Sequence, residues 1–275
     1  MIINGIDYLF HYTSLERLAQ ILKNRTIRLS PLENMDDLQE RKARDIDNFG
    51  RFFFTSCWTE EKTESIPMWN MYTNIRAGVR IALPKNPFKR HRTTVEGLTS
   101  VLKTPPMSNS TNEANTFLDL ADLYRNNYFS PQAWSGDILF QINYTDDIEL
   151  LEPHIVFRSD NKINLQTSTF GRYKNTYWKF QKEWRYLMLF IPMHFGTDVN
   201  LMNYEFNLTV NRMALGQQAA PFDHFDLDID PEMFKKMIIT KSPKLSEGNQ
   251  ILLNSIIKEY NPNAHIEESD LYGLI

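Results

Sequence analysis

The stretch Phe10-His11-Tyr12-Thr13-Ser14-Leu15-Glu16 decides the fold expected for the start of this 275-residue chain. A strand ends in it and a helix begins, because Thr13 followed three residues later by Glu16 has the spacing of a capping box. Apolar residues at helical spacing continue the helix to Asn24, and Thr26-Ile27-Arg28-Leu29-Ser30 alternates like a second strand. The pattern predicts a strand-helix-strand unit whose first strand ends beside a helix N-terminus, where anionic ligands often bind.

The composition is that of an ordinary globular protein. Hydrophobic residues make up 42% and charged residues 23%, and the net charge of −4 does not mark the whole chain as a binder of nucleic acid or membrane. The single cysteine, Cys57, lies in an apolar run, so we expect a buried, unreactive thiol and a reducing, cytoplasmic setting. We expect no signal peptide, because the N-terminus lacks a basic start and a long apolar run. We expect no membrane-spanning segment, because no window approaches about 18 apolar residues.

The remaining pattern predicts a mixed α+β fold and a single domain over residues 1–275. We expect strands at residues 52–58, 78–83 and 186–191, and a strand-helix-strand unit at the C-terminal end. Pro67 suits the first turn of a helix in which Trp69 and Tyr72 share one face. The mixed-sign run from Glu40 to Asp45 predicts a solvated helix, and residues 93–130 an inserted loop and helix region.

A second informative stretch lies between Tyr177 and Phe190. Its end is a continuous apolar run of strand length, which indicates a central strand covered on both faces. Glu183 and Arg185 precede that run and share one face by strand alternation. A carboxylate at the mouth of a buried strand is unfavourable unless it is paired or used, so Glu183 is a candidate site residue with Arg185 orienting it.

Several motifs agree with one bacterial family. They are the opening unit from Phe10 to Ser30, then Cys57-Trp58-Thr59-Glu60, then Ser65-Ile66-Pro67-Met68-Trp69-Asn70-Met71-Tyr72, and the element from Lys174 to Arg185. Together they resemble the family called domain of unknown function twenty-nine seventy-one, and the resemblance covers most of the chain.

A more distant similarity concerns the chemistry. His11-Tyr12-Thr13 before a helix, and the later Phe180-Gln181-Lys182-Glu183, are similar to elements of the ADP-ribosyltransferases that modify nucleic acids. The resemblance implies an ADP-ribosyltransferase-like split, mixed β-sheet that clamps NAD as co-substrate, with helices around it. It also implies a toxin of a toxin–antitoxin or anti-phage system that modifies RNA or DNA, with an antitoxin protein as a further partner.

The same resemblance implies catalytic roles for Glu183, Tyr72 and His11. Cleavage of the nicotinamide–ribose bond passes through an oxocarbenium-like state, which the Glu183 carboxylate would stabilise. Glu183 would also accept a proton from the incoming nucleophile. The ring of Tyr72 or Trp69 would stack on the nicotinamide.

The implied cofactor-binding residues lie mainly in the opening unit. His11, Tyr12 and Thr13 would hold the ribose on the adenosine side. Arg28 and Ser30 would meet the pyrophosphate, since a guanidinium binds phosphate bidentately.

Three other interpretations stay open. One is a non-catalytic module of the same fold that binds a nucleotide or a partner, in which Glu183 and Arg185 form only a structural salt bridge. The second is an ADP-ribosyltransferase acting on a protein, and the third is a metal-dependent nuclease using Asp36 and Asp37. The enzymatic interpretation requires His11 and Glu183 to line the same cleft.

Overall fold

The computed structural model describes residues 2–3, 5–94, 113–132, 137–159, 162–193 and 199–275. The protein is a mixed α+β structure built on one ten-stranded sheet. The strands of this sheet are β1 (Ile2–Ile3), β2 (Ile6–Ser14), β3 (Thr26–Pro31), β4 (Phe53–Thr59), β5 (Gly78–Pro84), β9 (Leu139–Gln141), β14 (Glu183–Leu189), β16 (Phe225–Asp228), β17 (Ile238–Lys241) and β18 (His265–Glu267). The order along its main path is β16-β3-β4-β2-β5-β17-β18.

Shorter elements surround the large sheet. The two-stranded sheets pair β6 (His91–Thr94) with β7 (Glu113–Thr116), β8 (Tyr128–Phe129) with β15 (Ile191–Pro192), β10 (Asn143–Thr145) with β13 (Tyr173–Asn175), and β11 (Val156–Ser159) with β12 (Lys162–Leu165). The α-helices are α1 (Leu15–Asn24), α2 (Ile66–Tyr72), α4 (Leu120–Arg125), α6 (Ile148–Leu151), α7 (Val199–Ala214), α8 (Pro231–Lys235) and α9 (Glu247–Tyr260). Three 3₁₀ turns complete the set: η1 (Leu32–Asn34), η2 (Phe49–Phe52) and η3 (Thr176–Gln181).

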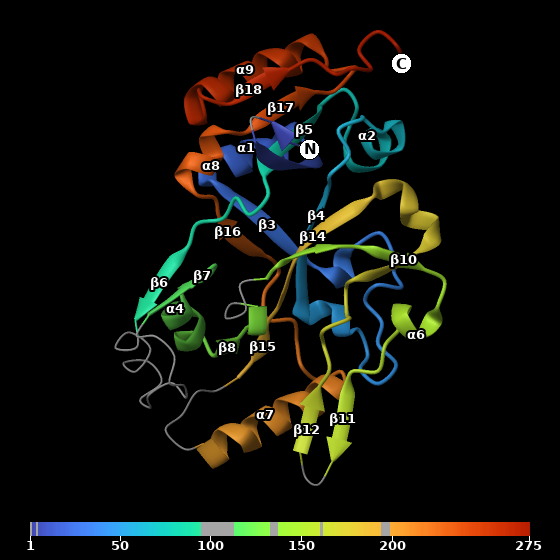
Figure 1. Ribbon diagram of the computed structural model, residues 1–275, viewed down its shortest axis with the longest axis vertical. Helices are drawn as coiled ribbons and strands as arrows, with labels where there is room; N and C mark the ends of the chain where they lie inside the picture. Colours follow the sequence, from blue (N-terminus) through green and yellow to red (C-terminus); the bar gives the residue numbers. More distant parts are fainter. Residues whose placement is uncertain (1, 4, 95–112, 133–136, 160–161, 194–198) are drawn as a thin grey trace.

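Figure 1 shows how these elements are distributed. Helix α9 lies with β17 and β18 at the end of the molecule where both termini are found, and α7 lies with the β11–β12 hairpin at the opposite end. Strands β3, β4 and β14 meet in the middle. No helix in the described part of the chain has the length and apolar character needed to cross a membrane.

Strand β4 forks the large sheet. Along one edge it pairs with β14 over its whole length, from Phe53 to Thr59. The opposite edge is shared: β3 pairs only at Phe54 and Thr55, and β2 only at Thr59. The residues between Thr55 and Thr59 therefore have no strand partner on that edge, and β2 and β3 diverge from β4 there.

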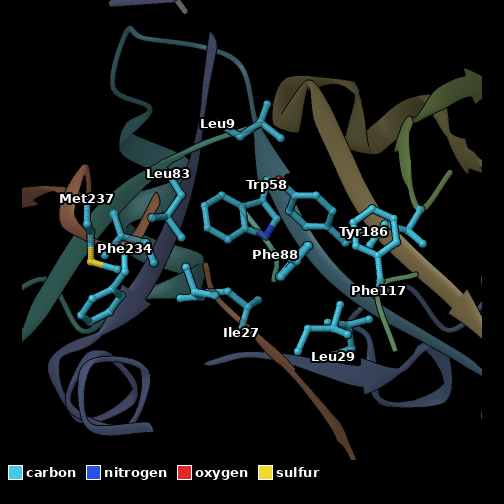
Figure 2. Packing of buried hydrophobic residues seen from close by; sticks show 14 of the residues in the cluster. Leu9, Ile27, Leu29, Trp58, Leu83, Phe88, Phe117, Tyr186, Phe234 and Met237 are labelled. Atoms are coloured by element: carbon cyan, nitrogen blue, oxygen red, sulfur yellow. The ribbon is translucent and has the colours of Figure 1, made fainter. Parts of the chain in front are cut away.

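The main core fills the space between these strands. Figure 2 shows Trp58 of β4 surrounded by buried side chains from distant parts of the chain, including Leu9, Tyr186 and Phe88. The rings of Trp58 and Tyr186 meet edge to face, with centroids 5.8 Å apart. Because β14 is buried on both faces, the prediction of a central strand over the apolar run that follows Glu183 is confirmed.

The described part of the expected insertion is packed into this core. Only Leu120–Arg125 within it is α-helical, and it is flanked by the short strands β7 and β8. Phe117, Leu123 and Tyr124 belong to the same buried cluster as Trp58. Residues 95–112 lie outside the described residues.

Helix α1 begins one residue later than the capping-box pattern predicts. Ser14 is the N-cap, and its hydroxyl accepts a hydrogen bond from the Arg17 N–H at 3.1 Å. Thr13 is the penultimate residue of β2, and its buried hydroxyl has no hydrogen-bond partner in the described part of the chain. The assignment of Thr13 as the cap was wrong because two adjacent hydroxyl residues offer the same chemistry, and the strand continues through the first of them.

The charged run from Glu40 to Asp45 does not form the expected solvated helix. It lies in turns between η1 and η2, and the Glu40 side chain is only 2% exposed. Glu40 is buried because two cations from distant strands meet it there. A local charge pattern carries no information about such partners.

We predict that Ser14→Ala lowers the free energy of unfolding by about 1 kcal/mol, because an N–H group of the first turn of α1 loses its acceptor. Urea unfolding of the purified protein measures the change. Glu16→Gln should leave the stability unchanged. Equal losses for the two substitutions would instead indicate a capping box.

Candidate functional site

A cleft of about 420 Å³ lies in the fork between β2, β3 and β4. Helices α1 and α2 form further walls, and the floor includes residues of β13 and β14. This volume is within the range of small-molecule sites in proteins, which are commonly about 300–1,000 Å³. The cleft exists because β2 and β3 cannot both follow the same edge of β4.

Most of the residues predicted from the sequence line this cleft. They are His11, Tyr12, Thr13, Arg28, Ser30, Tyr72 and Glu183. His11 and Glu183, which are far apart in the sequence, thus meet at one cleft as the enzymatic interpretation requires. Trp69 is not among the lining residues.

His11 presents an imidazole with one nitrogen free. Its Nδ1 is 2.7 Å from the Cys57 carbonyl oxygen, and its ring lies 5.1 Å from that of Trp58. Burial lowers the pKa of His11, which favours the neutral ring. A carbonyl only accepts, so Nδ1 carries the proton and Nε2 is left as an acceptor. Nε2 has no hydrogen-bond partner among the described residues.

Two threonine hydroxyls on the cleft wall are also unpartnered. Thr13 and Thr55 are each 2% exposed, and the Oγ1 atom of each has no hydrogen-bond partner among the described residues. A buried polar group left unsatisfied costs about 1–3 kcal/mol. The cleft therefore offers three unused polar groups to a ligand that carries hydroxyls or other hydrogen-bonding atoms.

Glu183 lies in a buried network of four charged side chains. Its Oε1 accepts a hydrogen bond from Arg185 Nε at 2.5 Å, and its Oε2 is 3.1 Å from Lys174 Nζ. Glu40 closes the network, 2.5 Å from Arg185 and 3.7 Å from Lys174. Each of the four residues is at most 5% exposed. Two carboxylates and two cations balance, which is the condition under which burial of charge is tolerated.

The network separates the protonation behaviour of its two carboxylates. Burial alone would raise the pKa of Glu183, but Arg185 and Lys174 outweigh it and lower the pKa to about 2. For Glu40 burial prevails over the same two cations and raises the pKa. Glu183, which lines the cleft, therefore stays ionised near neutral pH.

The network extends to the aromatic residue expected at the site. Lys174 Nζ donates to Gln181 Oε1 at 2.8 Å, and the Gln181 amide donates to the Tyr72 hydroxyl. Burial, then the nearby charge of Asp36, raises the pKa of Tyr72, so its hydroxyl stays protonated. Tyr72 is therefore fixed beside Glu183 through two intermediate side chains.

Trp69 and Tyr12 do not present their rings to a ligand. Trp69 is fully buried, and its indole N–H donates to Glu64 Oε2 at 2.8 Å. The Tyr12 ring packs edge-on against Trp69 at 4.9 Å, and its hydroxyl accepts from the Ser65 N–H. The expectation that Trp69 stacks on nicotinamide is not met. Trp69 and Tyr72 lie on the same face of α2, but Trp69 packs into the core while Tyr72 lines the cleft.

Arg28 lines the cleft but already has an anionic partner. Its Nε and a terminal nitrogen donate to the two oxygens of Asp226 at 2.9 and 3.0 Å. This bidentate pair uses two of the five N–H donors of the guanidinium and neutralises its charge, so Arg28 is a weaker partner for pyrophosphate than an unpaired arginine would be. Ser30 lies beside it on the same strand, at the edge of the cleft.

Other charged side chains on the cleft remain unpaired. Arg17 of α1, Asp36 and Asp223 line it, and within the described residues none of them forms a hydrogen bond or ion pair through its side chain. The charge of Arg17 contributes to lowering the pKa of His11, and the charge of Asp36 contributes to raising the pKa of Tyr72. The cleft therefore has an unpaired guanidinium near His11 and an unpaired carboxylate near Tyr72.

The Cys57 thiol is half-buried rather than fully buried, and it lines the cleft. Burial, then the carboxylate of Glu183, raises the pKa of this thiol, so little thiolate forms near neutral pH. This agrees with the prediction of an unreactive cysteine.

The metal-dependent nuclease interpretation depends on Asp36 and Asp37. Among the described residues, no group of three or more His, Cys, Asp or Glu side chains is arranged to hold a metal ion. Asp37 instead accepts a hydrogen bond from the Gln39 N–H and caps a turn.

Comparisons with protein-family models, curated proteins and solved structures give no match. The interpretation of the cleft therefore depends on its own geometry.

The sequence analysis missed Glu40 and Arg17 as site residues, and it named Asp36 only as a metal ligand in the nuclease interpretation. Glu40 and Asp36 lie in irregular turns, where periodicity gives no orientation. Arg17 was detectable in principle, because Arg17, Gln20 and Asn24 recur at helical spacing on one face of a helix. Lys174 and Gln181 lay within the quoted motifs, but no role was assigned to them.

We predict that the ionised Glu183 makes stability depend on pH in the acid range. Its folded pKa of about 2 lies below the ordinary value of 4.5, so the unfolded chain binds more protons between these values. The contribution, on the order of 3 kcal/mol, is present above pH 4.5 and is lost as the pH falls toward 2.

Urea unfolding at pH 6, 4 and 3 measures this effect. Glu183→Gln should be less stable than the wild type at pH 6 and should lose less stability on acidification. Glu16→Gln, on the exposed side of α1, serves as the control and should follow the wild-type profile. Parallel profiles for wild type and Glu183→Gln would contradict the low pKa.

Proposed function

We propose that this chain is an NAD-dependent ADP-ribosyltransferase with an ADP-ribosyltransferase-like split sheet. The observation that carries the proposal is the meeting of His11 and Glu183 on one cleft at the fork of the sheet. The residues were expected together only from resemblance to such enzymes. Their juxtaposition in the fold is independent support.

The charges around Tyr72 suit the reactive end of NAD. The nicotinamide ring of NAD carries a positive charge, and the carboxylates of Asp36 and Glu183 lie close enough to Tyr72 to raise its pKa. A cation beside an aromatic ring and fixed carboxylates is favourable in a partly desolvated site. Tyr72 therefore takes the role of the stacking residue, without Trp69.

The reaction breaks the bond between the ribose C1′ and the nicotinamide nitrogen. The electron pair of that bond leaves with the nicotinamide, and C1′ becomes oxocarbenium-like. Glu183 stabilises this positive charge and accepts a hydrogen bond from a ribose hydroxyl. The acceptor nucleophile then forms a new bond at C1′ and releases its proton to solvent.

The low pKa of Glu183 favours an electrostatic role over that of a general base. A carboxylate with a pKa of about 2 takes up a proton poorly near neutral pH. His11 contributes differently, because its free Nε2 accepts a hydrogen bond from a ribose hydroxyl of the bound dinucleotide. The unpartnered hydroxyls of Thr13 and Thr55 add further contacts.

We propose a nucleic acid, RNA or DNA, as the acceptor, and a toxin of a toxin–antitoxin or anti-phage system as the biological setting. The preference for nucleic acid comes from the resemblance. It is supported by η3, which presents the exposed rings of Tyr177 and Phe180 beside Lys179. Exposed aromatic rings next to basic groups suit stacked bases and backbone phosphates. Gln181 of η3 lines the cleft, which places this surface next to Glu183.

A second candidate function is a nucleotide-binding module without catalysis. The specific observation in its favour is that both oxygens of Glu183 are already paired with Arg185 and Lys174. A carboxylate held in this way is also what a purely structural ion pair requires.

We predict that the protein transfers ADP-ribose from NAD to nucleic acid and releases nicotinamide. NAD labelled in its adenosine half is incubated with RNA, with DNA and with cell extract, and label transfer and free nicotinamide are measured. Glu183→Gln should lower the rate by about 10²–10³. His11→Ala should also lose activity, whereas Lys23→Gln, outside the cleft on α1, should not.

Loss of the Glu183 charge also weakens the buried network, so each variant is first checked by circular dichroism and thermal unfolding. Tyr72→Leu supplies a second test that leaves the ion network intact. If the wild type neither transfers the label nor releases nicotinamide, the enzymatic proposal is refuted. NAD binding without nicotinamide release would favour the binding module, and label on protein alone would change the acceptor.

Expression of the wild type in bacteria should arrest growth, and Glu183→Gln should relieve the arrest at equal protein level. Growth curves with immunoblots measure both. An active enzyme that leaves growth unchanged would refute the toxin role and not the chemistry.

A further inference from the structure

We infer that one face of α1 binds the adenosine diphosphate half of the dinucleotide. This inference deepens the proposed function and rests on it. The face is formed by Arg17, Gln20, Ile21 and Asn24, which all line the cleft. They recur at helical spacing, so one stripe of the helix faces the ligand.

Arg17 is the cation best placed for the diphosphate. Within the described part of the chain, its guanidinium has no hydrogen bond and no carboxylate partner. The other two cationic side chains on the cleft are occupied, Arg28 by Asp226 and Lys174 by the buried network. A free guanidinium binds phosphate oxygens bidentately.

A second observation points to a ligand at the same place. The Thr13 hydroxyl is 2% exposed, unpartnered and on the cleft wall. Arg17 is close enough to the neighbouring His11 to lower its pKa. The backbone N–H groups at the start of α1 do not complete the site by themselves, because those of Leu15 and Arg17 already donate to Ala77 and Ser14.

The amide side chains further along α1 suit the base. Gln20 and Asn24 are exposed on the cleft side, and neither forms a hydrogen bond through its side chain within the described residues. Asparagine and glutamine amides match the adjacent donor and acceptor on the edge of adenine. At about 1.5 Å per residue, Asn24 lies about 10 Å beyond Arg17, so diphosphate and base reach different ends of the stripe. Ile21 between them offers an apolar surface.

This arrangement also gives the ligand a direction. The part of the cleft around Tyr72, close to Asp36 and Glu183, receives the nicotinamide, and the stripe on α1 receives the adenosine diphosphate.

The test is calorimetric titration of the full-length protein with ADP, GDP and inorganic pyrophosphate. Arg17→Gln should weaken binding of both ADP and pyrophosphate about tenfold or more. Asn24→Ala and Gln20→Ala should weaken the binding of ADP and reduce the preference for ADP over GDP. Both should leave the binding of pyrophosphate unchanged. Lys23→Gln removes a positive charge from the same helix outside the cleft and should change nothing.

Three results would overturn the inference. They are no ADP binding by the wild type at millimolar concentration, a loss with Arg28→Gln but not with Arg17→Gln, and equal losses with Arg17→Gln and Lys23→Gln. Arg17-dependent ADP binding by a protein that never cleaves NAD would support the nucleotide site while refuting the transferase. NAD cleavage that is unaffected by Arg17→Gln would support the transferase while refuting the nucleotide site on α1.

Discussion

The edge of β4 that β2 and β3 share is the constraint on which the rest of the structure depends. Both strands run antiparallel to β4, and each pairs with it only briefly before diverging. The backbone between those contacts is left without a ladder partner, and one of its carbonyls, that of Cys57, bonds to His11 instead. Unpaired strand edges are normally covered or avoided. Here the exposed stretch becomes the wall of a cleft, and the helix that joins the diverging strands becomes another.

Electrostatics then decides what the cleft is able to do. A carboxylate inside a protein normally takes up a proton, because burial disfavours its charge. Arg185 and Lys174 reverse this for Glu183, and Glu40 balances the two cations. The outcome is a fixed negative charge near Tyr72 and a free guanidinium, that of Arg17, near His11. Such a division suits a ligand whose own charge changes sign along its length, as that of NAD does.

The elements that the sequence predicted well are those encoded locally. The opening strand-helix-strand unit, the helix with Pro67 in its first turn and the C-terminal strand-helix-strand unit all follow from periodicity and caps. Apart from the N-cap of α1, the errors concern partners far away in the chain. Arg28 was on the right wall, but its pairing with Asp226 depends on β16 joining β3. Glu40 carried no local signal of burial, because its burial depends on a cation from β14. Trp69 and Tyr72 share a helical face, but the division of that face between core and cleft depends on strand β2.

The closed charge balance of the buried network also limits how this sequence can diverge. Replacing Glu40, Lys174, Glu183 or Arg185 singly leaves an uncompensated charge inside the protein, which typically costs about 3–5 kcal/mol. Replacing one cation and one carboxylate of the network together leaves no uncompensated charge. These positions should therefore change in concert among descendants of the same ancestor, although they are widely separated along the chain. Coordinated variation among them would mark proteins that kept the network, and its loss would mark those in which the cleft has taken on different chemistry.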